Sequence, residues 1–114
     1  MIIKKADMKQ EIRKEMRGGS GEVKILHMVS PESLTNARLM AELDLAPGSG
    51  IGLHRHDKET EYYIITEGSG IVVEDDGDKN ISKGDIVITG NGQSHSIKNT
   101  GNTVLKFIAV IITE

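Results

Sequence analysis

The sequence predicts a single all-β domain, either a sandwich or a barrel. From residue 22 onward, short runs of β-branched and apolar residues alternate with turns, and no long helical period interrupts them. Glycine supplies 13 of the 114 residues, above the usual share of about 7%, so many tight turns are expected. With 37% hydrophobic and 27% charged residues, the chain can bury a core of its own. We expect one domain over residues 1–114, with an N-terminal arm over 1–19 and a β-barrel over 20–114.

The N-terminal arm has a helical pattern. Apolar residues recur every four positions at Met8, Ile12 and Met16, and Asp7 offers an N-cap just before them. This spacing predicts a short helix over residues 8–16, which the following glycine pair ends. Such a helix would cover an open edge or end of the β-domain.

Several short segments after the arm have the composition of β-strands. Asp76-Gly77 favours a two-residue hairpin turn between two of them. The last segment is apolar on both faces apart from Lys106, so it is either central in a sheet or covered by a partner chain. The predicted strands cover residues 22–29, 36–46, 62–67, 70–75, 85–90, 94–99 and 103–112.

Charge and composition exclude several classes of partner. The net charge is -3, from 14 basic and 17 acidic residues, and only 3% of residues are aromatic. No basic block or row of stacking side chains is available for nucleic acid. No apolar run approaches the roughly 20 residues that cross a bilayer, and the first residues lack the apolar region of a signal peptide. We therefore expect no nucleic-acid or membrane partner and a cytoplasmic location.

The stretch HRHDKETEYY, residues 54–63, is a candidate metal-binding segment. Residues two apart on a strand share a face, so His54 and His56 can direct both imidazoles to one point. A turn over Asp57–Thr60 would bring Glu61 back beside them, and His95 lies in another predicted strand. With no cysteine in the chain, any metal must use nitrogen and oxygen ligands. An H-x-H pair also occurs in exposed polar turns, so this segment alone leaves both interpretations open.

Glycines around the candidate ligands follow a regular spacing. The first segment reads Gly48, five residues, His54, one, His56, four, Glu61, six, Gly68, and the second reads Gly84, five residues, Gly90, one, Gly92, two, His95, three, Asn99. These segments resemble the two conserved motifs of the cupin superfamily, and the 15 residues between them fit the expected gap. The second motif departs once, where Gly90 stands in place of the usual proline.

The resemblance to small single-domain cupins implies a fold and a site. The fold would be a conical antiparallel jelly-roll barrel, or double-stranded β-helix, with a metal in its lumen. His54, His56, Glu61 and His95 would hold one divalent ion per chain, with manganese ranked first and iron, nickel, zinc or copper as alternatives. The same resemblance implies a homodimer with a small-molecule substrate.

Two classes of function are compatible with such a site. The first is a metal-dependent enzyme, an oxalate decarboxylase-like protein or a dioxygenase, acting on a small carboxylate or 2-oxo acid. The second is a non-catalytic module that binds or senses a metal or small molecule. Polar groups in the lumen beyond the four ligands would favour the enzyme, and an apolar lumen lined by Ile51, Leu53 and Ile65 would favour the module. Oxalate decarboxylases carry a polar residue three positions before the first histidine, where this chain has Ile51.

No residue is a firm catalytic candidate. Tyr63 shares strand parity with Glu61 and is a pocket candidate, whereas alternation turns Arg55 outward. His27 is expected to be a strand histidine that is either bonded to a neighbouring group or placed at a dimer surface. Asn99 is expected to hold a turn. The carboxylates of Asp57, Glu59 and Glu67 lie in predicted turns or at strand ends and are expected to be solvated.

Overall fold

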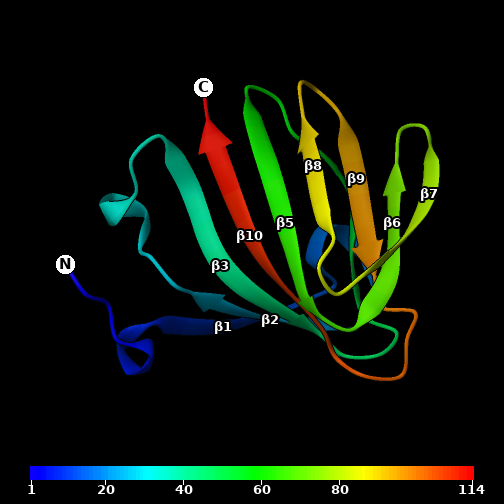
Figure 1. Ribbon diagram of the computed structural model, residues 1–114, viewed down its shortest axis with the longest axis horizontal. Coiled ribbons are helices and arrows are strands. Elements are labelled where there is room, and N and C mark those ends of the chain that lie inside the picture. The colour runs from blue at the N-terminus through cyan, green and yellow to red at the C-terminus, as the bar shows by residue number, and fades with distance from the viewer.

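The computed structural model describes residues 1–114 as two antiparallel β-sheets packed face to face (Figure 1). One sheet has six strands in the order β1-β2-β3-β10-β5-β8, and the other has four in the order β4-β9-β6-β7. This double-sheet arrangement confirms the predicted all-β jelly roll. The strands are β1 (Lys9–Lys14), β2 (Glu22–His27), β3 (Ala37–Leu45), β4 (Gly50–Arg55), β5 (Glu59–Glu67), β6 (Ser69–Glu74), β7 (Gly77–Ser82), β8 (Ile86–Gly90), β9 (Ser94–Lys98) and β10 (Leu105–Thr113).

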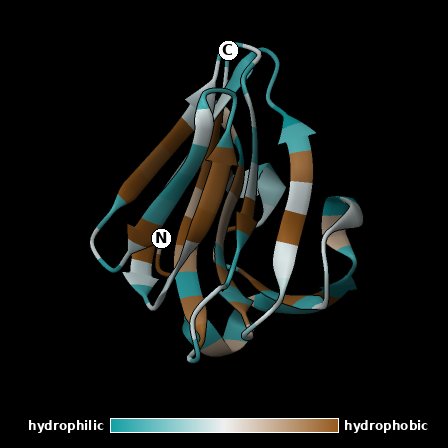
Figure 2. Ribbon diagram, turned by 90° about the vertical axis from the view of Figure 1, so that its right-hand side faces the viewer, coloured by the Kyte–Doolittle hydropathy of each residue, from teal (hydrophilic) through white to brown (hydrophobic).

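The hydrophobic core lies between the sheets and contains side chains from both. Alternate residues along the strands point inward, as the pleat requires, and Figure 2 shows hydrophobic and hydrophilic positions interleaved along several strands. Strand β10 lies between β3 and β5. Of the two explanations for its apolar sequence, a central strand or a strand covered by a partner chain, the structure shows the first. Phe107 on this strand is fully buried and pairs with Leu43 and Ile65.

The helix predicted over residues 8–16 is wrong. Lys9–Lys14 form strand β1, which pairs antiparallel with β2, and only the three-residue 3-10 turns η1 (Lys5–Asp7) and η2 (Met16–Gly18) are helical here. A spacing of four is also a multiple of two, so the pattern fits one face of a strand as well as one face of a helix. Of the three apolar residues, only Ile12 lies within β1. Pairing with β2 satisfies the backbone of this segment, whereas so short a helix is marginal without tertiary packing.

Turns between strands follow the sequence closely. A two-residue turn joins β6 to β7 one position earlier than predicted, at Asp75-Asp76, because Glu74 pairs with Gly77, which is the first residue of β7. The turn after the H-x-H pair is shorter than the predicted Asp57–Thr60, because β5 already begins at Glu59. No helix in the structure has the length and apolar character needed to span a membrane.

Candidate metal centre

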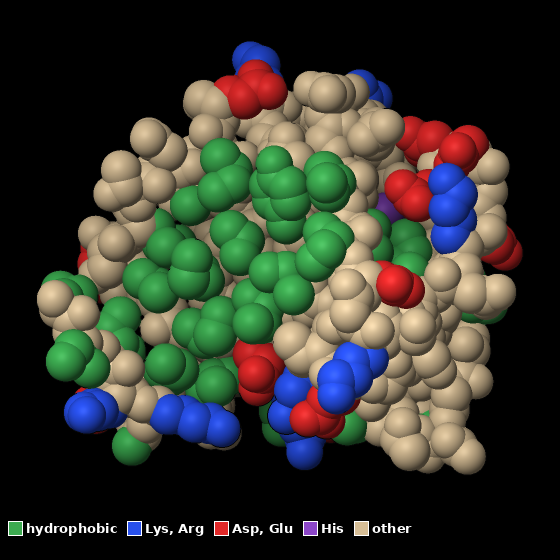
Figure 3. All heavy atoms as spheres, viewed as in Figure 1, with side chains coloured by type: hydrophobic (Ala, Val, Ile, Leu, Met, Phe, Trp, Pro, Cys, Tyr) green, Lys and Arg blue, Asp and Glu red, His purple; other side chains and the backbone are tan.

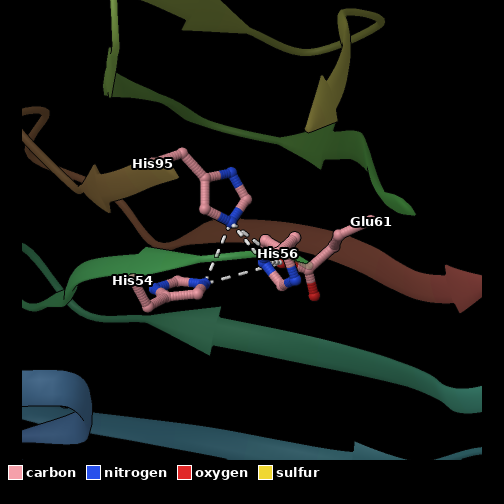
Figure 4. Close-up of side chains that lie close together, drawn as sticks. All are labelled: His54, His56, Glu61 and His95. Atoms are coloured by element: carbon pink, nitrogen blue, oxygen red, sulfur yellow. Dashed lines mark hydrogen bonds and ion pairs between the residues drawn. The ribbon is translucent and has the colours of Figure 1, made fainter. Parts of the chain in front are cut away.

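The four candidate ligands meet between the two sheets. His54 lies on β4, His56 follows that strand directly, Glu61 lies on β5 of the opposite sheet, and His95 lies on β9. His54 and His95 are paired across the β4–β9 ladder. Figure 4 shows all four side chains directed toward one another. The fold thus brings together residues up to 41 positions apart in the chain.

A β-bulge sets which side chains of β4 face this point. The β4–β9 register shifts by one between Ile51 and His54, and a bulge of this kind re-aims the residues that follow it. Ile51 and His54 therefore both face the interior, although they are three positions apart. Leu53 points outward and is 65% exposed. The expectation that Leu53 could line the lumen is wrong for this reason.

The distances between donor atoms are short. The Nε2 atom of His95 lies 3.0 Å from Nε2 of His54, 3.1 Å from Nε2 of His56 and 2.9 Å from Oε1 of Glu61. Oε1 of Glu61 lies 3.0 Å from Nε2 of His56 and 3.7 Å from Nε2 of His54. One donor atom from each residue thus lies within 4.8 Å of all the others.

The outer ring nitrogens fix the direction of two lone pairs. Nδ1 of His54 donates to the carbonyl oxygen of Gly52 at 2.7 Å, and Nδ1 of His56 donates to Oε2 of Glu59 at 2.6 Å. Because both acceptors lack a hydrogen, the proton of each neutral ring lies on Nδ1. The Nε2 atoms then present bare lone pairs to the Glu61 carboxylate and to His95. A cluster of converging electron pairs is the arrangement that a cation satisfies.

Burial and charge act on the same groups. Burial would raise the pKa of Glu61, but the His54, His56 and His95 rings, which donate to this carboxylate when they carry a second proton, hold that pKa well below the ordinary value. The bond with Glu61 raises the pKa of His56, whereas burial lowers the pKa of His95. The carboxylate therefore stays ionised, and it favours positive charge at the point where the donors converge.

The donor set fits a divalent transition ion. Imidazole and carboxylate suit manganese, iron, nickel, copper and zinc. Donors at right angles about 2.1 Å from one ion lie about 3.0 Å apart, whereas tetrahedral donors lie about 3.4 Å apart. Four of the donor separations, from 2.9 to 3.1 Å, match the first value. These four residues form a group that could hold a metal ion.

A cavity of about 250 Å³ is lined by three of the four candidate ligands, His54, His56 and Glu61. Its walls include Ile51, as expected, but not Ile65, which is buried in the core. Beyond the candidate ligands, the lumen is lined by both apolar and polar side chains. The polar ones are Arg13, Arg17, His27, Arg38 and Tyr63.

Tyr63 lies inside this cavity, as its parity predicts. Its side chain is 2% exposed, its ring stacks on His95 with centroids 4.9 Å apart, and its hydroxyl oxygen lies 3.4 Å from Nε2 of His95. Burial raises the pKa of Tyr63, and the nearby Glu61 raises it further. The phenol therefore keeps its proton and can donate a hydrogen bond into the cavity.

An ion pair that the sequence did not predict lies behind His56. Glu59, expected to be solvated, has a side chain only 13% exposed and accepts two hydrogen bonds from Arg38, at 2.7 and 2.8 Å. The hydrogen bonds from Arg38 lower the pKa of Glu59 most, and the contact with His56 lowers it further, so that this pKa is about 2. The β3–β10 register skips Arg38, since Ala37 pairs with Ile112 and Leu39 with Ile111. This bulge directs the Arg38 side chain toward Glu59. In the sequence, only the position of Glu59 three residues after His56 indicated that Glu59 could contact that histidine.

The remaining expectations concern residues beside the site. Nε2 of His27 contacts Glu11 at 2.6 Å across the β1–β2 ladder, and Arg55 lies on the exterior, bonded to Asp57 at 3.0 Å. The Asn99 amide donates to the carbonyl oxygens of Leu45 and Thr103, both at 2.8 Å. Asn99 therefore has the structural role that was expected.

Gly90 stands where the related motif carries proline, and its surroundings explain the difference. Its backbone nitrogen donates to Oε1 of Gln93 at 3.2 Å, a bond that proline cannot make. A Cβ atom at this position would press against the hydroxyl of Thr60. The turn before His95 is thus closed by a hydrogen bond in place of a proline ring.

An antiparallel jelly roll with three histidines and a glutamate converging in its interior defines the class of this protein as a β-barrel with a candidate metal centre. A model of the cupin domain matches residues 41–111, and the chain belongs to the cupin family.

Known proteins resemble the chain over its whole length. It is 46% identical to the oxalate-binding protein of Thermotoga maritima over 113 residues, covering 98% of this chain and 93% of that protein. The crystal structure of a predicted oxalate decarboxylase from the same species matches with a TM-score of 0.94 at 44% identity, covering 100% of both chains. The polyketide cyclase RemF from Streptomyces resistomycificus matches with a TM-score of 0.78 at 16% identity, covering 100% of this chain and 80% of that one. This last likeness concerns the fold alone.

Proposed function

We propose that this cupin binds one divalent metal ion through His54, His56, Glu61 and His95, and with it a small carboxylate such as oxalate. The observation that carries the proposal is the set of lone pairs converging on one buried point, with a cavity of only about 250 Å³ above it. Drug-sized ligands need about 300–1,000 Å³, so this volume favours a ligand of a few heavy atoms. The name of the oxalate-binding relative supports the same ligand class.

The residues of the chain have separate roles in this proposal. When bound, a divalent ion supplies a positive centre that oxygen donors can chelate. Met16, Leu39 and Ile51 form apolar walls that limit water in the cavity. Manganese is the first choice of ion, with iron, nickel, zinc or copper as the alternatives.

Turnover is a second candidate function, as an oxalate decarboxylase-like enzyme or a dioxygenase. Tyr63 is the observation that favours it, because a protonated phenol lies in the cavity beside the donor set. Decarboxylation requires a group that can give or hold a proton near the reacting carboxylate. Tyr63 is placed to do so, whereas the carboxylates of Asp57 and Glu67 are exposed.

Metal analysis and ligand titration test the proposal. Purified protein is expected to hold up to one divalent ion per chain by elemental mass spectrometry. Calorimetry is expected to show oxalate binding to the manganese form and none to chelator-treated protein. Assays of oxalate and 2-oxo acids with manganese(II) or iron(II) then separate the candidates: product formation supports an enzyme, and binding without product supports a binding protein. Oxalate affinity that is equal with and without metal would contradict the proposal.

Replacing Glu59 with glutamine should weaken metal binding by roughly 10-fold, the lower end of the effect of losing a partner behind a metal ligand. The amide is neutral, so it orients the His56 ring less firmly and supports its basicity less than the carboxylate at 2.6 Å does. The affinity is measured by competition with a chromogenic chelator. Asp57→Asn is the matched control, because Asp57 bonds only the exterior Arg55. Equal losses in both variants would rule out a specific role for Glu59.

We also propose that a second copy of the chain covers the outer face of the six-stranded sheet. Figure 3 shows apolar side chains gathered on this face. A broad apolar face can pair with its own copy across a two-fold axis. Its residues on β5, β8 and β10 include Ile64, Ile86, Ile88, Ile108, Val110 and Ile112, of which Ile88 is 56% exposed.

The Ile88→Lys variant should elute as a monomer, whereas the unmodified chain should elute as a dimer. A charge buried in an apolar interface costs several kcal/mol. Light scattering after size-exclusion chromatography gives the mass directly. Leu53→Lys is the matched control, since Leu53 is an exposed aliphatic residue on the other sheet, at 65%. An unmodified chain that is monomeric at high concentration would contradict the proposal.

A further inference from the structure

One wall of the cavity beside the candidate ligands is apolar. Ile51 forms part of this wall, is 3% exposed and lines the cavity with its side chain. The turn η2 packs against β4 on the same side, and it contributes Arg17 to the same cavity. Arg17 of the N-terminal arm therefore places a positive charge near Ile51.

Arg17 differs from the other cations of the cavity because it has no carboxylate partner. Arg38 is paired with Glu59, and both Arg13 and His27 contact Glu11. Arg17 takes part in none of the ion pairs of the structure. Its side chain is exposed at the cavity mouth, where its charge is available to a ligand.

Arg17 borders the cavity that contains the candidate ligands. It lines the same cavity as His54, His56 and Glu61. The arginine is therefore placed to meet a ligand that binds in front of these donors.

The backbone holds Arg17 in an uncommon conformation. Its φ of 54° and ψ of 29° lie in the left-handed region, which side chains other than glycine, asparagine and aspartate seldom adopt. Close packing on β4 maintains this geometry, because a Cβ atom at Gly52 would overlap the carbonyl oxygen of Arg17. The same Gly52 accepts the hydrogen bond of His54. The backbone of Arg17 and the ring of His54 thus both contact Gly52.

The charges of the cavity suit a dianion. Arg38 and Arg13 are offset by Glu59 and Glu11. A divalent ion would bring two positive charges, the Glu61 carboxylate would offset one of them, and Arg17 would add one. The cavity would then carry a net charge of two positive units, which a small dicarboxylate would balance. A monocarboxylate would leave one of them without a counter-charge.

Building on the proposed function, we propose that Arg17 is the specificity-determining residue of the site. It binds the outward-facing carboxylate oxygens of a dicarboxylate that is held at the metal centre. Arg17 thereby supplies a positive charge from η2, an element that carries none of the four candidate ligands. The fork of N–H donors on a guanidinium matches a carboxylate better than a single ammonium does.

Oxalate and oxamate provide the test, because oxamate has the same skeleton but an amide in place of one carboxylate. Calorimetry on the manganese-loaded protein measures both affinities for the unmodified chain, Arg17→Gln, Arg17→Lys and the control Arg55→Gln, whose arginine lies on the exterior. Manganese affinity is measured for each variant first. The unmodified chain and Arg55→Gln should prefer oxalate. Arg17→Gln should bind manganese normally but oxalate on the order of 10- to 100-fold more weakly, and oxamate with a smaller loss.

The outcomes separate the two proposals. If the unmodified chain binds no oxalate in its manganese form, the proposed function fails and this inference fails with it. If the unmodified chain binds oxalate and Arg17→Gln keeps the full preference over oxamate, only this inference is overturned. If Arg17→Gln also loses manganese, Arg17→Lys decides: retained charge must restore a preference for oxalate, and its failure to do so overturns the inference.

Discussion

The double substitution His54→Ala and Glu61→Ala should reduce manganese affinity by much more than about 100-fold. A loss of roughly 100-fold is the upper end of the effect of removing a residue that only hydrogen-bonds to a metal ligand. Two of the four donors disappear, and Glu61 is the only carboxylate among them. The remaining imidazoles of His56 and His95 lie 3.1 Å apart and would offer two neutral donors. Elemental analysis of the purified variant and chelator competition measure the loss.

His27→Ala is the matched control for this experiment. His27 lines the same cavity, but its Nε2 atom contacts Glu11 and it does not belong to the donor group. Metal affinity should therefore be retained in that variant. An unchanged affinity in the double variant, or an equal loss in the control, would show that the metal binds elsewhere or not at all.

The candidate site could be predicted from sequence because its signals are local or regularly spaced. The H-x-H pair and Glu61 lie within one short segment, and the glycine spacing around His95 placed the last donor in the same set. The strands were predictable for a similar reason, since alternation along β3, β5 and β10 directly reflects their inner and outer faces.

The errors and omissions arise where position depends on contacts distant in sequence. The arm residues Met8, Ile12 and Met16 fit helix and strand periods equally, and only the pairing with β2 decides for a strand. Arg38 reaches Glu59 because of a bulge that no residue pattern announces. Arg17 enters the cavity because η2 packs on β4. Bulges and packing between elements thus decide which polar groups surround the donors.

The metal centre is also supported by the hydrophobic core behind it. Phe107 is fully buried on the central strand β10, and its ring lies 4.6 Å from that of Tyr63. The Tyr63 ring in turn stacks on His95 at 4.9 Å. This row of rings connects the core of the six-stranded sheet to a donor residue on the opposite sheet. The stability of the barrel and the placement of His95 therefore depend on the same packing.

Phe107→Ala should lower the free energy of unfolding by about 3–5 kcal/mol, the usual cost of emptying a buried phenylalanine site. That is a large part of the 5–15 kcal/mol available to a typical domain. Urea unfolding of chelator-treated protein, followed by circular dichroism, separates this effect from the stabilisation that bound metal adds. Ile88→Ala, at an exposed position on β8, should change stability far less when the variants are compared at the same low protein concentration.

Manganese affinity of the folded Phe107→Ala variant then tests the connection through Tyr63. With the supporting ring removed, Tyr63 gains freedom to move into the empty volume, and the His95 ring loses part of its fixed orientation. Affinity should therefore fall in Phe107→Ala and recover in Phe107→Leu, which refills much of the volume. Equal metal affinity in both variants, despite the loss of stability in the first, would show that the donors are positioned by their own strands and hydrogen bonds alone.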